Sequence, residues 1–208
     1  MSGKIAAIAA GVVFVGVGGA FLAVTTFAPA NDLRACIGSA VAGGDIGGPF
    51  SLVSETGDPV TDADVITGPT FVYFGYTFCP DACPLDMANM AEAMEILEEE
   101  KGHTVPGLFI TIDPERDTPE YLAEFTEYLH PNITGLTGTE EQVAAAASEY
   151  RAFYRKVDGD DPDFYLMDHS TLTYLMNPGG EMITFFRRDL TPAALAEQVG
   201  CIVEALDA

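Results

Sequence analysis

Residues 71–94 read FVYFGYTFCPDACPLDMANMAEAM, and this stretch decides how the chain folds and where its chemistry lies. Residues 71–74 are aromatic or β-branched without alternation, which is typical of a strand buried on both faces of a sheet. From residue 84 onward, apolar side chains recur at helical spacing and glutamates fill the opposite face. The stretch therefore predicts a central strand, a turn that carries Cys79 and Cys83, and a long helix.

The two cysteines lie four residues apart at the start of this helix. We expect Cys79 to precede the helix and Cys83 to lie in its first turn, where Pro84 is tolerated. Exposed N–H groups at a helix N-terminus favour a thiolate over a thiol, so the position predicts lowered cysteine pKa values. A thiolate binds a metal or attacks a disulfide. Two buried structural cysteines are the weaker interpretation, because prolines bracket the turn at the helix start.

Strands and helices alternate along the rest of the chain. Threonines that suit helix starts stand at positions 118, 139 and 191, and a second buried-type strand covers residues 108–112. Hairpins are expected over residues 49–61 and 172–186, and residues 153–157 and 164–167 flank an acidic turn. No strand is expected between the helix that ends near residue 130 and the helix that starts at residue 139. This order predicts an α/β domain of three layers. With cysteines between a central strand and the first long helix, it resembles a thioredoxin-like fold with an added N-terminal hairpin.

The N-terminal run of residues 5–27 is apolar or small and carries no charge. About 20 such residues span a bilayer, whereas the apolar core of a signal peptide is shorter, about 7–15 residues. We therefore expect one transmembrane helix as a retained anchor. A signal peptide cleaved near Ala30 is the alternative.

The anchor divides the chain into four parts. Residues 1–4, which include Lys4, are expected in the cytoplasm by the positive-inside tendency. Residues 5–28 form the anchor, residues 29–48 a tether, and residues 49–208 a domain on the other side of the membrane.

The net charge of −23 and the isoelectric point near 4.1 exclude some classes of partner. Binding to nucleic acid or to an anionic lipid surface requires basic patches, and the sequence has none. We therefore expect no nucleic-acid partner.

His169 is the candidate for a third functional side chain beside the two cysteines. It stands just before the hairpin expected at residues 172–186, in a loop that faces the cysteines in thioredoxin-like folds. Two thiolates and one imidazole suit Cu(I) or zinc and leave an open coordination position. A structural zinc site normally has a fourth ligand, and none is obvious. We interpret His103 as a loop residue and His130 as a cation at a helix end.

The methionines of the long helix offer another possible set of copper ligands. Their thioethers recur at helical spacing, at Met87, Met90 and Met94. This spacing is more often that of core residues, and we assign them to the core.

Three motifs stand out in the sequence: YFGYTFCPDACP at residues 73–84, DPERDTP at residues 113–119 and DHS at residues 168–170. They resemble those of the Sco/SenC family of copper-binding, membrane-anchored proteins. The resemblance covers roughly residue 49 to the C-terminus. One departure is Phe78, because the family often has histidine at this position.

The resemblance implies a function and a set of site residues. Cys79, Cys83 and His169 would bind copper, as Cu(I) or Cu(II), for delivery to the binuclear copper centre of cytochrome c oxidase. The partners would be the copper-site subunit of the oxidase and a copper donor protein. The domain would lie in the periplasm, anchored to a bacterial inner membrane, or on the equivalent intermembrane-space side in mitochondria.

The resemblance leaves the roles of other residues open. Asp113, Asp117 and Asp168 would support the ligands or fix loops, and for the first two the alternative is capping of the helix that begins at Thr118. The cysteine pair also fits a thiol–disulfide oxidoreductase that reduces the copper-site cysteines of the oxidase. We favour a copper-binding assembly factor over an enzyme, with thiol–disulfide oxidoreductase activity as the alternative; a peroxidase-like activity has no further feature in its favour.

Cys36 and Cys201 remain once the other two cysteines are assigned to the metal. Cys36 lies on the tether and Cys201 at the edge of the apolar side of the last helix. We hypothesise a disulfide between them, which can persist outside the cytoplasm. A free Cys36 with a buried Cys201 is the alternative.

Overall fold

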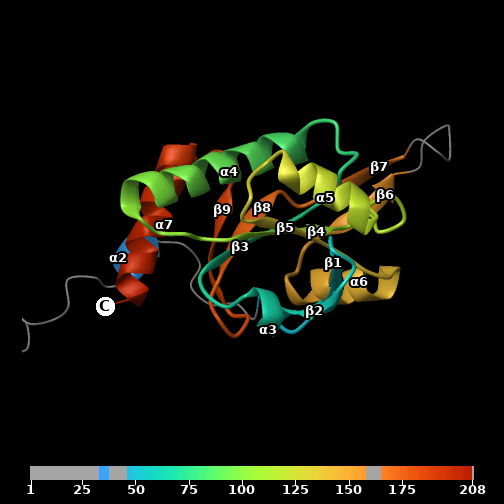
Figure 1. The fold of residues 1–208 in the computed structure, drawn as a ribbon, viewed down its shortest axis with the longest axis horizontal. Helices are drawn as coiled ribbons and strands as arrows, with labels where there is room; N and C mark the ends of the chain where they lie inside the picture. Colours follow the sequence, from blue (N-terminus) through green and yellow to red (C-terminus); the bar gives the residue numbers. More distant parts are fainter. Residues whose placement is uncertain (1–32, 38–45, 158–164, 208) are drawn as a thin grey trace, which may run out of the picture.

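The computed structural model of the chain is built around one seven-stranded sheet (Figure 1), in which the predicted central strand is β3 (Thr70–Gly75). The strand order is β2-β1-β5-β4-β3-β8-β9. β3 pairs in parallel with β4 (Gly107–Thr111), and every residue of these two strands is buried. The other strands of the sheet are β1 (Ser51–Ser54), β2 (Pro59–Thr61), β5 (Ile133–Thr137), β8 (Leu172–Met176) and β9 (Met182–Arg187).

Helices cover both faces of this sheet. α4 (Ala82–Lys101) and α5 (Pro119–Glu127) lie on one face, and α6 (Glu140–Glu149) lies on the other (Figure 1). α7 (Pro192–Leu206) packs against α4. The predicted three-layer α/β domain is confirmed, as is the added N-terminal hairpin, which is β1 and β2.

The predicted helix boundaries are confirmed where a capping residue marks them. Thr118, Thr139 and Thr191 accept hydrogen bonds from backbone N–H groups in the first turns of α5, α6 and α7. Gly102 ends α4 in a left-handed conformation, with φ of 70°. α4 begins at Ala82, two residues before the predicted start at Pro84.

The strand β5 was not expected from the sequence. Its residues ITGLT contain Gly135, which weakens a strand pattern, yet β5 pairs in parallel with β4. A Cβ atom at position 135 would lie 2.7 Å from the Cβ of Leu122, so glycine lets α5 pack closely on the strand. Two short helices were also missed, α2 (Leu33–Ile37) and α3 (Asp62–Val65).

A second, two-stranded sheet carries part of the candidate site. It consists of β6 (Tyr154–Val157) and β7 (Leu166–His169), which pair antiparallel with Tyr154 opposite His169. These are the segments that the sequence placed on either side of an acidic turn.

The predicted disulfide between Cys36 and Cys201 is present and joins α2 to α7. The two Cα atoms lie 5.6 Å apart, and the side chain of Gln198 donates a hydrogen bond to the Cys36 carbonyl at 3.1 Å. Ile37, the next residue, is buried in the core. The predicted tether is therefore fastened to the domain at Cys36.

The structure describes residues 33–37, 46–157 and 165–207. Within these ranges no helix is both long enough and apolar enough to cross a membrane. The predicted anchor, residues 5–28, and the predicted cytoplasmic residues 1–4 lie outside the described residues.

Candidate metal centre

The two cysteines stand where β3 passes into α4. Cys83 lies in the first turn of the helix and is fully buried, whereas Cys79 lies in the preceding loop and is half-buried. The N–H group of Cys83 points at the sulfur of Cys79, at 3.3 Å. Both thiols are free, so they are available to a metal or to each other.

His169 is the last residue of β7, and the prediction that it lies in a loop is wrong. Its ring lies edge-on to two buried aromatic rings of the β3 segment, Tyr73 at 6.2 Å and Tyr76 at 5.9 Å between centroids. The Nδ1 atom lies 2.9 Å from the carbonyl oxygen of Ser170. Because a carbonyl only accepts, Nδ1 carries the proton and Nε2 is left to accept a hydrogen bond or bind a metal.

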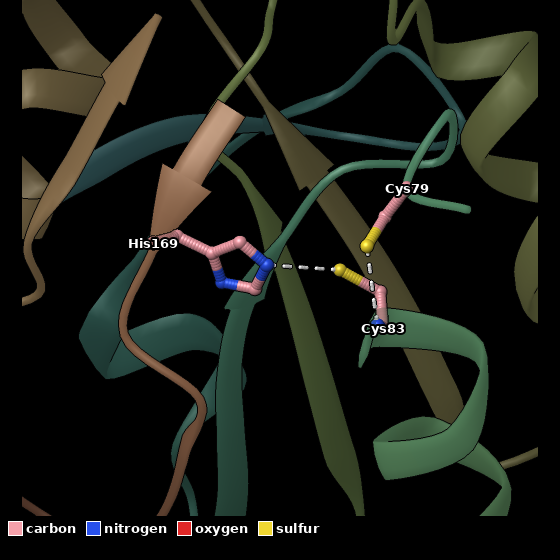
Figure 2. A group of neighbouring side chains, drawn as sticks. All are labelled: Cys79, Cys83 and His169. Atoms are coloured by element: carbon pink, nitrogen blue, oxygen red, sulfur yellow. Dashed lines mark hydrogen bonds between the residues drawn. The ribbon is translucent and has the colours of Figure 1, made fainter. Parts of the chain in front are cut away.

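The three predicted side chains meet at one point (Figure 2). Nε2 of His169 lies 3.3 Å from the sulfur of Cys83, and both sulfurs and a ring nitrogen lie within 4.8 Å of one another. The residues come from two elements 86 positions apart in the chain. Two sulfurs and one imidazole nitrogen form a donor set for a soft or borderline metal ion.

The acidity of Cys83 differs from the prediction. Burial raises the pKa of its thiol, and a hydrogen bond with the backbone of Tyr76 offsets only part of this effect. The expectation of a lowered pKa is therefore wrong for Cys83, because loss of solvent outweighs the helix N-terminus. A metal ion that binds this sulfur must displace its proton.

Asp117 fixes the start of the cysteine loop. Its carboxylate accepts hydrogen bonds from the N–H of Thr77 at 3.0 Å, from the Thr77 hydroxyl at 2.6 Å and from the Thr111 hydroxyl at 2.6 Å. Burial raises the pKa of Asp117, and these hydrogen bonds partly compensate. The contacts agree with the predicted role of fixing a loop, and Thr118, not Asp117, caps α5.

Asp113 and Asp168 have different surroundings. Asp113 is buried, pairs with Arg116 and accepts a hydrogen bond from the Tyr165 hydroxyl at 2.7 Å. Asp168 is exposed and bonds Arg155 at 2.6 Å. Side chains alternate along a strand, so Asp168 points away from His169, its neighbour in β7. The expectation that Asp168 supports the three candidate ligands is therefore wrong.

The other two histidines lie outside this group. His130 lies three residues after the end of α5, is buried, and its Nδ1 accepts a hydrogen bond from the N–H of Asn132 at 3.1 Å. His103 lies 3.9 Å from Glu204 on the opposite end of α4 from the cysteines. The methionines at 87, 90 and 94 are buried in the core, as predicted.

Comparison with known proteins identifies the family. A model of the SCO1/SenC family matches residues 39–204. The chain belongs to the SCO1/SenC family. It is 49% identical over 208 residues to Protein SenC of Rhodobacter capsulatus, covering 99% of this chain and 93% of that protein.

Two solved SCO1/SenC structures share the fold of the domain. ScoI of Arabidopsis thaliana, solved with copper bound, is 38% identical with a TM-score of 0.72, over 78% of this chain and 98% of that one. Yeast Sco1, also solved with copper bound, is 34% identical with a TM-score of 0.71, over 78% of this chain and 89% of that one. The resemblance seen in the three motifs is confirmed.

Within this SCO1/SenC chain, Phe78 is held by an arginine that sequence reasoning missed. The guanidinium carbon of Arg116 lies 4.8 Å from the centre of the Phe78 ring and 3.6 Å from that of Tyr165. Such cation–π contacts stabilise by about 0.5–2 kcal/mol. Arg116 lies in the DPERDTP motif, so this motif holds the cysteine loop at Phe78 as well as at Thr77.

Proposed function

We propose that this chain binds one copper ion through the sulfurs of Cys79 and Cys83 and the Nε2 atom of His169. It then passes the ion to the binuclear copper site of cytochrome c oxidase. The observation that carries the proposal is the convergence of these three atoms within 4.8 Å at the start of α4.

The donor set suits copper that is bound and later released. Thiolate sulfur is a soft ligand and favours Cu(I), while imidazole binds both oxidation states. Three protein ligands leave a position that an incoming ligand can occupy, so the ion can be handed over by exchange. The half-buried Cys79 is the ligand that a partner protein reaches first.

The relatives support copper as the cargo. The Arabidopsis and yeast proteins described above were solved with copper bound, and they share the fold and a third or more of the aligned residues. The function implied by the family resemblance supplies the oxidase as the acceptor and a separate copper donor protein.

The apolar N-terminal run and the disulfide support a location outside the cytoplasm. Residues 5–28 would anchor the chain in the membrane, with the domain in the periplasm or on the intermembrane-space side. The Cys36–Cys201 bond supports this assignment, because disulfides persist in oxidising compartments and are rare in the cytosol.

Copper titration of the reduced full-length chain tests the proposal. We expect one Cu(I) per chain for the wild type, and no stable binding for Cys79→Ala or Cys83→Ala. His169→Ala should bind more weakly and show an altered Cu(II) absorption spectrum. His103→Ala is the matched control, since His103 is a partly exposed histidine at the far end of α4. Tight binding by Cys79→Ala would show that the ligands are misassigned.

A second candidate function is thiol–disulfide exchange with the copper-site cysteines of the oxidase. It is favoured by two free thiols at the start of a helix in a thioredoxin-like fold, one half-buried and one buried. His169 distinguishes the two functions, because exchange needs only the cysteines. His169→Ala should impair copper binding and leave formation of the Cys79–Cys83 disulfide intact.

A further inference from the structure

A buried carboxylate lies one turn beyond Cys83, and the proposed ligand set does not use it. The side chain of Asp86 is only 6% exposed, although it stands three residues after Cys83 on α4. Burying a charge is costly unless it is paired and hydrogen-bonded. Asp86 meets both conditions: one oxygen lies 3.2 Å from Nε of Arg188, and the other accepts a hydrogen bond from the Tyr73 hydroxyl at 2.9 Å.

Tyr73 connects this carboxylate to the candidate metal centre. The tyrosine is fully buried in β3, where its ring stacks on Phe109 with 6.3 Å between the centroids. The edge-on contact with His169 has an interplanar angle of 87°, and the hydroxyl group is hydrogen-bonded to Asp86 on α4, the helix that carries Cys83. Tyr73 thus contacts one ligand, His169, and is hydrogen-bonded to the helix that carries the other, Cys83.

The two ligands Cys83 and His169 are carried by different elements of the fold, so the position of Tyr73 between them matters. Cys83 is held by α4, whereas His169 ends β7 in the separate two-stranded sheet. His169 is joined to the seven-stranded sheet by β8, which begins three residues later and pairs with β3, whereas Cys83 lies on α4. Packing between the side chains of these elements therefore contributes to the distance between Cys83 and His169. The ring of Tyr73 lies against His169, and its hydroxyl is tied to α4 through Asp86.

We propose that Tyr73 and Asp86 form a positioning unit, neutralised by Arg188, which sets the spacing of Cys83 and His169 and thereby the affinity for copper. The inference rests on the proposed copper site and deepens it. Tyr73 and Asp86 act through the ligands and bind no metal themselves. Arg188 directly follows β9 and is 44% exposed, so it balances the buried charge from the surface.

Removing one hydroxyl group tests the unit with little change in shape. We expect Tyr73→Phe to lower Cu(I) affinity about tenfold or more, because groups that orient metal ligands typically contribute 10–100-fold to affinity. The absorption band of the Cu(II) form should shift as well. Tyr150→Phe is the matched control: Tyr150 is also fully buried, and its hydroxyl has no hydrogen-bond partner among the described residues.

Substitution of Asp86 tests the link between the carboxylate and Tyr73. Asp86→Asn keeps an oxygen that can accept the Tyr73 hydroxyl, while Arg188 can turn into solvent, so we expect affinity within about threefold of the wild type. Asp86→Ala removes the acceptor and should reproduce the loss seen in Tyr73→Phe. If Asp86→Ala fails to fold, the Tyr73→Phe variant still decides the question.

A double-mutant cycle distinguishes positioning from general weakening of the fold. Cu(I) affinity is measured by competition with a chromophoric chelator for the full-length chain, for Tyr73→Phe, for His169→Ala and for the pair. In the His169→Ala background, Tyr73→Phe should have less than a third of the effect on Cu(I) affinity that it has in the wild type. An equal loss in both backgrounds, or a Tyr73→Phe affinity equal to that of Tyr150→Phe, would overturn the positioning role. A wild-type chain whose copper binding does not depend on Cys79 would instead overturn the proposed function, and the positioning role with it.

Discussion

Removal of the Cys36–Cys201 disulfide should be the most destabilising change outside the metal centre. The bond joins residues 165 positions apart, so it encloses nearly the whole domain. In the chain-entropy model, closing a loop of this size lowers the entropy of the unfolded chain and so stabilises the folded state by about 5 kcal/mol. Removing a native disulfide typically lowers the free energy of unfolding by about 2–5 kcal/mol. We expect Cys36→Ser/Cys201→Ser to lower the free energy of unfolding by about 3–5 kcal/mol and the melting temperature by about 10 °C.

Urea and thermal unfolding of the full-length chain without reductant measure this effect. Cys79→Ser/Cys83→Ser is the matched control, because it also replaces two cysteines by serine but keeps the disulfide. The dependence of the unfolding free energy on urea should become steeper, since the unlinked chain exposes more surface when it unfolds. A loss below about 1 kcal/mol would refute the reasoning that the bond acts mainly on the unfolded chain.

Two further predictions concern the cysteine loop and the proton that copper displaces from Cys83. Asp117→Ala removes the acceptor of three hydrogen bonds to Thr77 and Thr111, so it should destabilise the chain by about 2–4 kcal/mol in urea unfolding. Asp168→Ala, which loses only an exposed ion pair, should cost less than about 1 kcal/mol, and equal losses for the two variants would contradict the loop-fixing role. Because burial raises the pKa of Cys83, this thiol holds its proton at neutral pH and copper must displace it. The apparent Cu(I) affinity should therefore rise with pH, by about tenfold per unit for each proton released, between about pH 6 and pH 8; a flat profile in chelator competition would show that the site binds copper without losing a proton.

The central strand, the cysteine loop and the long helix could be predicted from the sequence because local signals agree there. An unbroken apolar run marks β3, and Gly102 ends α4 at the predicted residue. The strand β5 could not be predicted, since Gly135 weakens its local pattern. Its position depends on pairing with β4 and on the close approach of Leu122, and both are tertiary effects.

The three candidate ligands could be predicted from their residue types and motifs. The residues that surround them could not be predicted. The sequence shows Tyr73 and Asp86 only as a core tyrosine and one acid among many in a chain of net charge −23. Their contact joins a strand to a helix and becomes visible only in three dimensions. Asp168 shows the opposite error: it is a neighbour of His169 in sequence, but alternation along β7 turns it away.

X-ray absorption of the Cu(I)-loaded full-length chain tests the central claim most directly, because it counts the atoms around the metal. We predict a first shell of two sulfurs and one nitrogen, with outer-shell scattering from one imidazole ring. His169→Ala should lose the imidazole signal and keep both sulfurs, and His103→Ala should match the wild type. A shell with fewer than two sulfurs, or an imidazole signal that persists in His169→Ala, would contradict the assignment of Cys79, Cys83 and His169 as the copper ligands.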